Sequence, residues 1–105
     1  MLGEFEQLVL MSVMRVGGDA YGIPIHAELR HRTGRDPTLA AVYKTLERLE
    51  DKGFLASRLG EATPERGGRR KRFFSITSAG RRELRTSLAA IRKMAAGLDV
   101  GLEPS

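Results

Sequence analysis

Apolar residues recur at helical spacing near the start of the chain. From Glu4 to Arg15 they cover two faces of a helix, and the pair Gly17-Gly18 ends it. A helix that is apolar on two sides packs against two partners. We therefore expect one face to pack within its own domain and the other to contact a second subunit. The first face carries Phe5, Leu8, Val9, Ser12, Val13 and Val16, and the second carries Leu10, Met11 and Met14.

A second helix follows the glycine pair. It is predicted to begin near Asp19 or Tyr21 and to end at Gly34. Pro24 falls in its first turn, where proline is tolerated because a backbone N–H at that position has no helical partner.

A third helix is expected after a short polar stretch. Thr38 is its predicted N-cap, and the helix runs to residue 52 and is closed by Gly53. Helices over 21–33 and 38–52 joined by so tight a turn are typical of a helix-turn-helix. The residues of the third helix that are expected to face inward are Leu39, Val42, Leu46 and Leu49.

Beyond Gly53 the apolar spacing changes. Two short runs, 54–59 and 71–76, flank a polar segment with glycine and proline, which predicts a hairpin. Thr77 is the expected N-cap of a last helix over 77–98. Its apolar residues alternate at spacings of four and three, the pattern of a coiled-coil seam. We expect Leu84, Leu88, Ile91 and Leu98 to form a dimer interface.

Composition restricts the function classes. No apolar run approaches the roughly 18 residues of a membrane span, and no basic segment precedes an apolar one at the start. Cysteine is absent, so we expect a cytoplasmic protein without membrane contact. The net charge is +5, and residues 54–105 hold eleven Lys and Arg against five Asp and Glu. This asymmetry indicates a basic surface that attracts a polyanion.

Motifs for catalysis and metal binding are missing from the sequence. His26 and His31 are the only histidines, and with no cysteine they do not complete a metal-ligand set. There is no phosphate-binding loop, dinucleotide fingerprint or nucleophile elbow. We therefore expect neither an enzyme nor a metal or organic cofactor.

Several segments, taken in order, match a known family in sequence and spacing. They are Leu8-Val9-Leu10, Tyr21-Gly22, Arg32-Thr33-Gly34, Val42-Tyr43-Lys44-Thr45-Leu46, Arg48-Leu49-Glu50, Arg66-Gly67-Gly68-Arg69-Arg70 and Thr77-Ser78-Ala79-Gly80-Arg81. Together they resemble the PadR family of bacterial regulators, in its short branch with a single C-terminal helix. The resemblance implies a winged helix, homodimerisation through the last helix and repression at a palindromic operator. The last helix lacks the tryptophans on which some drug-binding relatives stack aromatic ligands.

These elements predict an α+β fold that is mostly α. We expect a winged helix-turn-helix with an N-terminal helix and an added C-terminal dimerisation helix. Residues 1–76 are expected to form the DNA-binding domain, 77–98 the dimerisation helix and 99–105 a flexible tail. A chain of 105 residues buries only a modest core, which also favours a homodimer.

In a helix-turn-helix the N-terminal half of the second helix enters the major groove. Opposite the inward stripe, we expect DNA contacts from Thr38, Ala41, Tyr43, Lys44 and either Thr45 or Arg48. Threonine and lysine reach base edges or phosphates, alanine touches a thymine methyl, and a tyrosine hydroxyl meets a phosphate oxygen. The alternatives are a half-buried core ring for Tyr43 and ordinary solvent exposure for Lys44.

The predicted hairpin loop adds a cluster of cations. The run from Arg66 to Arg72 holds five basic residues, no acid and two glycines that allow close approach to a ligand. Arg66, Arg69 and Arg70 are the expected phosphate or minor-groove contacts, and a solvated basic face is the alternative. Tyr21, near a helix N-terminus, fits either a phosphate contact or core packing.

The sequence favours a repressor that binds double-stranded DNA at a specific site as a homodimer. The alternative is a winged helix for protein–protein contact, in which the basic hairpin meets an acidic partner. A small-molecule effector is expected, if there is one, where the first and last helices of two subunits meet. The alanines and flexible methionines expected there either leave an apolar gap between the helices or pack closely and fill the core. They are Ala89, Ala90, Ala95, Ala96, Met11, Met14 and Met94.

Overall fold

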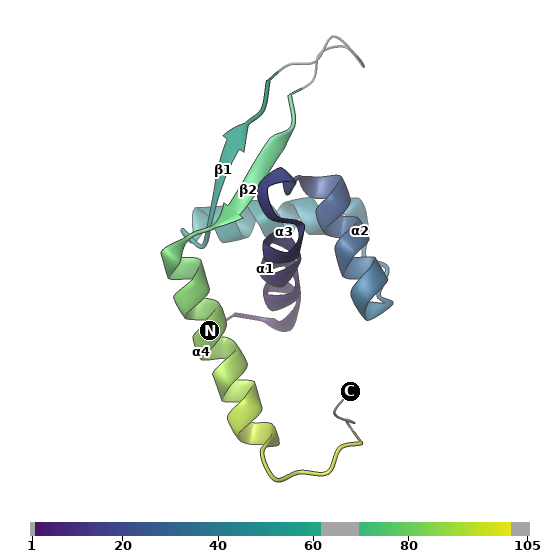
Figure 1. Ribbon diagram of the computed structural model, residues 1–105, viewed down its shortest axis with the longest axis vertical. Coiled ribbons are helices and arrows are strands. Elements are labelled where there is room, and N and C mark those ends of the chain that lie inside the picture. The colour runs from purple at the N-terminus through teal and green to yellow at the C-terminus, as the bar shows by residue number, and fades with distance from the viewer. Residues whose placement is uncertain (1, 62–69, 102–105) are drawn as a thin grey trace.

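In the part of the chain that the structure describes, four α-helices and one hairpin follow each other in the predicted order, and a 3-10 turn that the sequence did not predict follows the first helix. The computed structural model describes residues 2–61 and 70–101. Figure 1 shows the arrangement, which confirms the expected winged helix with an added C-terminal helix. The elements are α1 (Glu4–Val16), the 3-10 turn η1 (Gly17–Asp19), α2 (Gly22–Thr33), α3 (Leu39–Asp51), β1 (Leu55–Leu59), β2 (Arg72–Ile76) and α4 (Ser78–Ala95).

The capping residues lie where the sequence predicted them. The Thr38 hydroxyl accepts a hydrogen bond from the Ala41 backbone N–H at 3.0 Å, and Thr77 does the same for Gly80 at 3.0 Å. Gly34 follows α2 with φ +73°, a left-handed conformation that a side chain would strain. Local sequence therefore sets the ends of α2 and the starts of α3 and α4.

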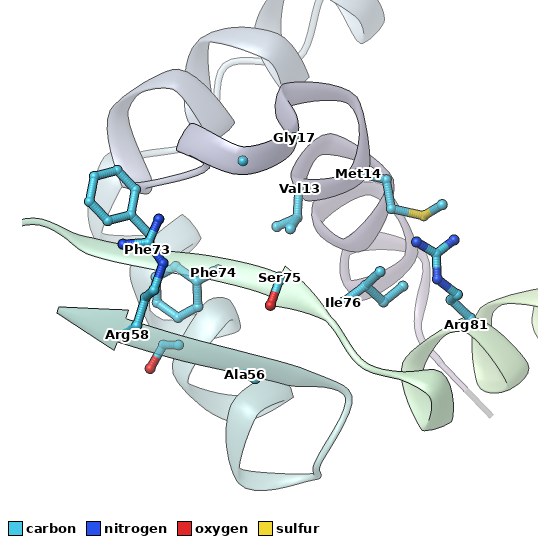
Figure 2. Close-up of a pocket in the computed structure, with 12 residues that line it drawn as sticks. Val13, Met14, Gly17, Ala56, Arg58, Phe73, Phe74, Ser75, Ile76 and Arg81 are labelled. Carbon is cyan, nitrogen blue, oxygen red and sulfur yellow. The ribbon is translucent and has the colours of Figure 1, made fainter. Parts of the chain in front are cut away.

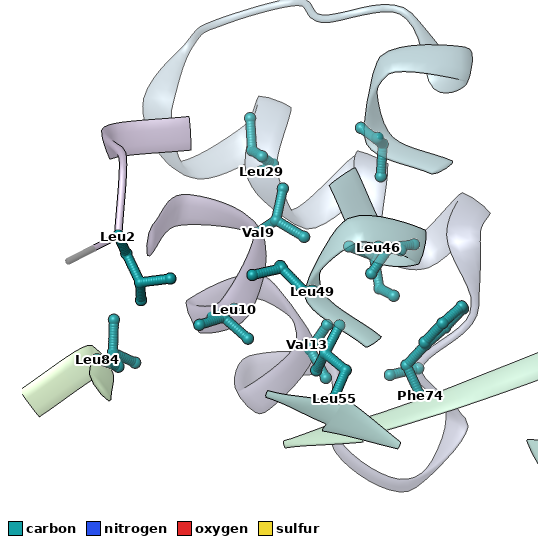
Figure 3. Close-up of a cluster of buried hydrophobic side chains, with 13 residues drawn as sticks. Leu2, Val9, Leu10, Val13, Leu29, Leu46, Leu49, Leu55, Phe74 and Leu84 are labelled. Carbon is teal, nitrogen blue, oxygen red and sulfur yellow. The ribbon is translucent and has the colours of Figure 1, made fainter. Parts of the chain in front are cut away.

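The hydrophobic core forms around α1 (Figure 3). Val9 and Leu10 are fully buried, and they pack with Ile25 and Leu29 of α2 and with the inward side of α3. Burial of each such side chain contributes about 1.5–3 kcal/mol. Met14 is exposed, so the second apolar face of α1 is only partly covered.

The buried stripe of α3 differs from the expectation at two positions. Val42, Leu46 and Leu49 are fully buried as predicted, but Leu39 is 36% exposed and Thr45 is buried. Thr45 lies on the side of α3 that faces α1, where Lys52 donates a hydrogen bond to Glu6 at 2.8 Å. Because that side is covered by α1, the expectation that Thr45 faces DNA is wrong.

The hairpin is an antiparallel pair whose register joins Leu55 to Ile76 and Leu59 to Arg72. Its base is fixed to the helices by the Phe74 backbone N–H, which donates to the Ala20 carbonyl at 2.7 Å. Phe74 is buried and Phe73 is partly exposed, as the alternation of a β-strand requires. The strand β2 is therefore attached to the helical part of the molecule through both the backbone and the side chain of Phe74.

Among the described residues, α4 packs against the rest of the molecule as far as Leu88 and is exposed beyond Ala90. A Cβ added at Gly80 would lie 2.2 Å from the Phe54 carbonyl oxygen, so this helix start needs glycine. Ser87 is fully buried and accepts a hydrogen bond from the Leu2 backbone N–H at 3.1 Å. Residues 91–100 are all exposed. Figure 1 shows this end of α4 pointing away from the hairpin.

The last helix is shorter than expected. It ends at Ala95 rather than at residue 98, and Gly97 follows with φ +81°. No packing partner among the described residues holds the chain helical beyond this point, so Leu98 lies outside the helix. Within residues 2–61 and 70–101, no helix is long and apolar enough to cross a membrane.

Candidate nucleic-acid interface

One face of α3 is fully turned to solvent. The four residues on this face lie within about 60° of one another around the helix, at 3.6 residues per turn. We call them the outer row of α3: Ala40, Lys44, Glu47 and Asp51, all exposed. The sequence expectation included Lys44 but missed Ala40, Glu47 and Asp51. Helical periodicity counted from the buried stripe would have found all three, because they lie opposite it.

The other expected residues of α3 lie on the flanks of this row. Thr38 is exposed, but its hydroxyl already caps the helix, and Ala41 is partly buried. Arg48 is exposed on the flank toward α1. Successive residues of a helix are turned by about 100°, so Arg48 does not share the face of its neighbour Glu47. Its charge helps to lower the pKa of Glu6.

Glu6 is a buried carboxylate that links α1 to the end of α3. It accepts hydrogen bonds from the Gly3 backbone N–H at 3.0 Å and from Lys52 Nζ at 2.8 Å. Burial alone raises the pKa of Glu6, but these hydrogen bonds and the charges of Lys52 and Arg48 outweigh it. The pKa of Glu6 therefore lies below its ordinary value, and the carboxylate fixes one end of α3.

Tyr43 lies on the opposite flank, against the first turn of α2. A Cβ at Gly22 would lie 2.3 Å from the Tyr43 Cζ and 2.4 Å from its hydroxyl oxygen, so the ring rests directly on the glycine backbone. The side chain is nevertheless 40% exposed. The ring is thus packed on one side and exposed on the other. Its hydroxyl lies beside the N-terminus of α2, where unpaired backbone N–H groups favour an anion.

Tyr21 is the N-cap residue of α2 and is packed against the hairpin. Its ring meets Phe73 edge-on, with centroids 5.8 Å apart, and Lys71 Nζ lies 4.5 Å from the Tyr21 centroid. These contacts agree with the packing alternative for Tyr21. They leave the phosphate contact without direct support.

Lys71 and Arg72, next to the hairpin loop, are engaged within the protein. Lys71 covers Tyr21, and Arg72 donates a hydrogen bond to the Ser57 hydroxyl at 2.9 Å. That hydroxyl in turn donates to the Glu50 carboxylate of α3. Ser57 and Glu50 were not expected from sequence, since nothing local indicates that β1 and α3 meet there. Arg70 is exposed, whereas Arg66 and Arg69 lie outside the described residues.

The expected dimer residues fall into two groups. Leu84 is buried within its own chain and points toward Leu2 (Figure 3), so it belongs to the protomer core. Leu88 is partly buried, whereas Ile91 is 51% and Leu98 is 63% exposed. A shallow apolar groove of about 420 Å³ runs along this end of the chain. It is lined by Ala90, Ile91, Met94, Ala95 and Leu98.

A separate cleft of about 520 Å³ lies between the end of α1 and the hairpin (Figure 2). Met14 and Arg81 lie at one end of it, and Arg58 stacks on Phe73 at the other, 4.7 Å from the ring centroid. This places Met14 beside the hairpin, away from the groove on α4. Among the described residues, no group of His, Asp or Glu could hold a metal ion. His26 instead forms a hydrogen bond with the Pro37 carbonyl, with 2.7 Å between Nε2 and the oxygen.

Comparisons with known proteins agree with this geometry. The model of the transcriptional regulator PadR-like family matches residues 9–86. A PadR family transcriptional regulator from Eggerthella lenta is 25% identical, with a TM-score of 0.71 over 90% of this chain and 81% of its own. A winged-helix DNA-binding protein from STIV is 14% identical, with a TM-score of 0.66 over 92% of this chain and 98% of its own.

A third similar structure contains nucleic acid. It is Bacillus subtilis PadR in complex with operator DNA, 18% identical, with a TM-score of 0.68. The match covers 97% of this chain and 50% of that one. No protein with a curated description matches the sequence significantly.

Proposed function

Because the chain belongs to the PadR-like family of transcriptional regulators, we propose that it is a repressor that binds a palindromic operator as a homodimer. Membership makes it a DNA-binding winged-helix regulator and not an enzyme. The observation that carries the finer proposal is the exposed outer row of α3, flanked by Tyr43 and by the cationic hairpin. A relative of the same family, Bacillus subtilis PadR, binds operator DNA.

We assign the contacts by their exposure. Lys44 reaches base edges or phosphates from the outer row, and the Tyr43 hydroxyl meets a phosphate beside the start of α2. Thr38 and Ala41 lie close to the DNA at the N-terminal end of α3. Arg70 contacts phosphate from the hairpin, with Arg66 and Arg69 proposed from sequence alone. Arg48 and Tyr21 hold positions at the edge of this surface.

The homodimer is supported by the unpacked end of α4. Exposed apolar residues on one helix end are covered when two copies meet. A two-fold protein reads an operator with two-fold symmetry, whose half-sites lie about one helical turn of DNA or a multiple apart. We place the interface at Leu88, Ile91 and Leu98, together with the exposed part of α1.

The effector proposal follows from this interface. A molecule bound between the subunits changes the distance between the two DNA-binding domains of the dimer. The affinity for DNA then changes to the extent that this molecule binds one arrangement of the subunits more tightly than the other. The apolar groove beside Ala95 favours an apolar occupant. Enlarging Ala95 to Trp fills the groove and is expected to weaken the effector response without loss of folding. Unchanged effector affinity in calorimetry would place the site elsewhere.

Selection of bound genomic fragments, followed by competition between the selected operator and random DNA, tests the function. Specific regulators prefer their site by roughly 10³- to 10⁷-fold. A ratio near one would contradict the repressor proposal and favour an acidic protein partner. Transcription from a promoter that contains the operator must fall when the protein is added. An increase would identify an activator. Acting on chromosomal DNA, the protein is expected to work in the cytoplasm.

A further inference from the structure

Glu47 is a carboxylate in the middle of the outer row of α3. Lys44 lies one turn before it, and Asp51 lies one turn after it. This face of the helix lies opposite its buried stripe. DNA that contacts the outer row therefore meets Glu47. An acidic residue at this place is unexpected for a surface that binds phosphates, because like charges repel.

The described residues offer Glu47 no partner. Glu50, three residues later, accepts a hydrogen bond from Ser57, and Glu6 accepts one from Lys52. Glu47 forms no hydrogen bond or ion pair with any residue of 2–61 or 70–101. It lines an open groove of about 420 Å³ between α3 and the hairpin, together with Tyr43, Glu50, Arg72 and Phe74. With respect to the residues that the structure describes, the carboxylate is available to accept hydrogen bonds from another molecule.

The major groove of DNA presents few donors. They are the exocyclic amino groups, N4 of cytosine and N6 of adenine, and glutamate accepts from the cytosine amino group. Ala40, about two turns earlier on the same face, leaves room for the helix to approach the bases closely. A carboxylate that reaches such an amino group gains a hydrogen bond that offsets its repulsion from the phosphates.

We propose that Glu47 is a specificity-determining residue that accepts a hydrogen bond from the N4 amino group of a cytosine in each operator half-site. The proposal rests on the proposed function, since it assumes that α3 occupies the major groove, and it requires that the helix lies in the groove beyond its N-terminal half, as far as its third turn, where Glu47 lies. It adds the identity of one base pair and the residue that reads it.

Two substitutions test this assignment in the full-length protein. Glu47→Ala removes the acceptor, and preference for cytosine at one position of each half-site should fall about tenfold, the usual cost of a mismatched base pair. Glu47→Gln keeps the size of the side chain and replaces the carboxylate by an amide. Because glutamine forms hydrogen bonds to adenine N6 and N7, the preferred base should change to adenine. Binding of randomised duplexes followed by sequencing measures both changes. The slope of log affinity against log salt should stay the same, because every phosphate contact is kept.

Asp51→Asn is the matched control, because it removes one negative charge from the same row without a base contact. It should raise affinity for all duplexes alike and leave every base preference unchanged. If Glu47→Ala behaves like Asp51→Asn, the inference is overturned while sequence-specific binding stands. A wild-type preference for adenine at the affected position would overturn the assignment to cytosine. If the wild-type protein does not separate its operator from random DNA, the proposed function itself fails.

Discussion

Neighbouring residues of α3 take different tasks because the helix turns by about 100° from one residue to the next. Val42 is buried, Tyr43 rests on Gly22, Lys44 is exposed and Thr45 is buried again. A tyrosine ring that is both packed and exposed holds its hydroxyl in a defined place. At this scale, DNA binding should depend on single functional groups.

Removal of one such group should be measurable. Tyr43→Phe deletes the hydroxyl and keeps the ring on Gly22. A hydrogen bond to a charged group contributes about 1.5–3 kcal/mol, so operator affinity should fall by roughly tenfold or more. Lys44→Ala should weaken binding by a similar amount, and Lys93→Ala, at the far end of α4, is the matched control. Fluorescence anisotropy measures all three. Equal affinities for wild type and Tyr43→Phe would exclude a phosphate contact by the hydroxyl.

The buried carboxylate of Glu6 predicts an acid dependence of stability. Its pKa is lowered in the folded protein, so the charged carboxylate stabilises the fold at pH values above the ordinary pKa of glutamate. That contribution is lost as the pH falls through the folded pKa. Urea unfolding at a series of pH values should show this loss in the wild type. In Glu6→Gln the free energy of unfolding should be lower near neutral pH and change less over the acid range. Parallel curves for the two proteins would contradict the assignment.

At the scale of elements, the hairpin divides its cations between two uses. Those at the start of β2, next to the loop, are engaged with the rest of the molecule: Arg72 joins Ser57 and Glu50, and Lys71 covers Tyr21. Together with the hydrogen bond from Phe74 to Ala20, these contacts set the angle between the hairpin and α3. The cations farther along the hairpin remain for DNA.

The salt dependence of DNA affinity distinguishes the cations that bind phosphate from those that hold the hairpin in place. Removing one phosphate contact reduces the slope of log affinity against log salt by about one. Arg69→Ala combined with Arg70→Ala should therefore flatten the slope by about one to two. Arg72→Ala should lower affinity through a less firmly held hairpin and leave the slope unchanged. If the double variant keeps the parental slope, the hairpin does not bind phosphates. If Arg72→Ala flattens it, Arg72 itself binds a phosphate.

At the scale of the whole molecule, α4 links two regions with different surroundings. Its N-terminal part, as far as Leu88, is held by Leu84 and by the hydrogen bond from Leu2 to Ser87. Its second half carries exposed apolar side chains and extends from a molecule 55 Å long in its greatest dimension. This arrangement is expected of an arm that joins two copies at a distance from their DNA-binding surfaces.

The arm gives a direct test of assembly. Ile91→Asp places a charge in the proposed interface, where burial without a partner is costly, and should give monomers in sedimentation velocity. Lys93→Asp is the matched control, since it adds an acid to the other side of the same helix end and should leave dimers. Because Ile91 is exposed in the protomer, folding should be retained, which circular dichroism can verify. Dimers that persist in Ile91→Asp would place the interface elsewhere.

The sequence by itself determined the order of the helices and the hairpin and most of their ends, because caps and periodicity act over a few residues; the end of α4 at Ala95 was not among them. Thr38, Gly34, Gly53 and Thr77 mark helix ends where the structure has them, and the family motifs point to the winged helix. The identity of the side chains in contact was decided only by the tertiary structure. Thr45 is buried because α1 covers it, Leu84 because Leu2 meets it, and Arg72 is engaged because β1 brings Ser57 beside Glu50. These contacts join residues that are far apart in the chain. A local sequence pattern does not determine which distant residues pack against a given side chain.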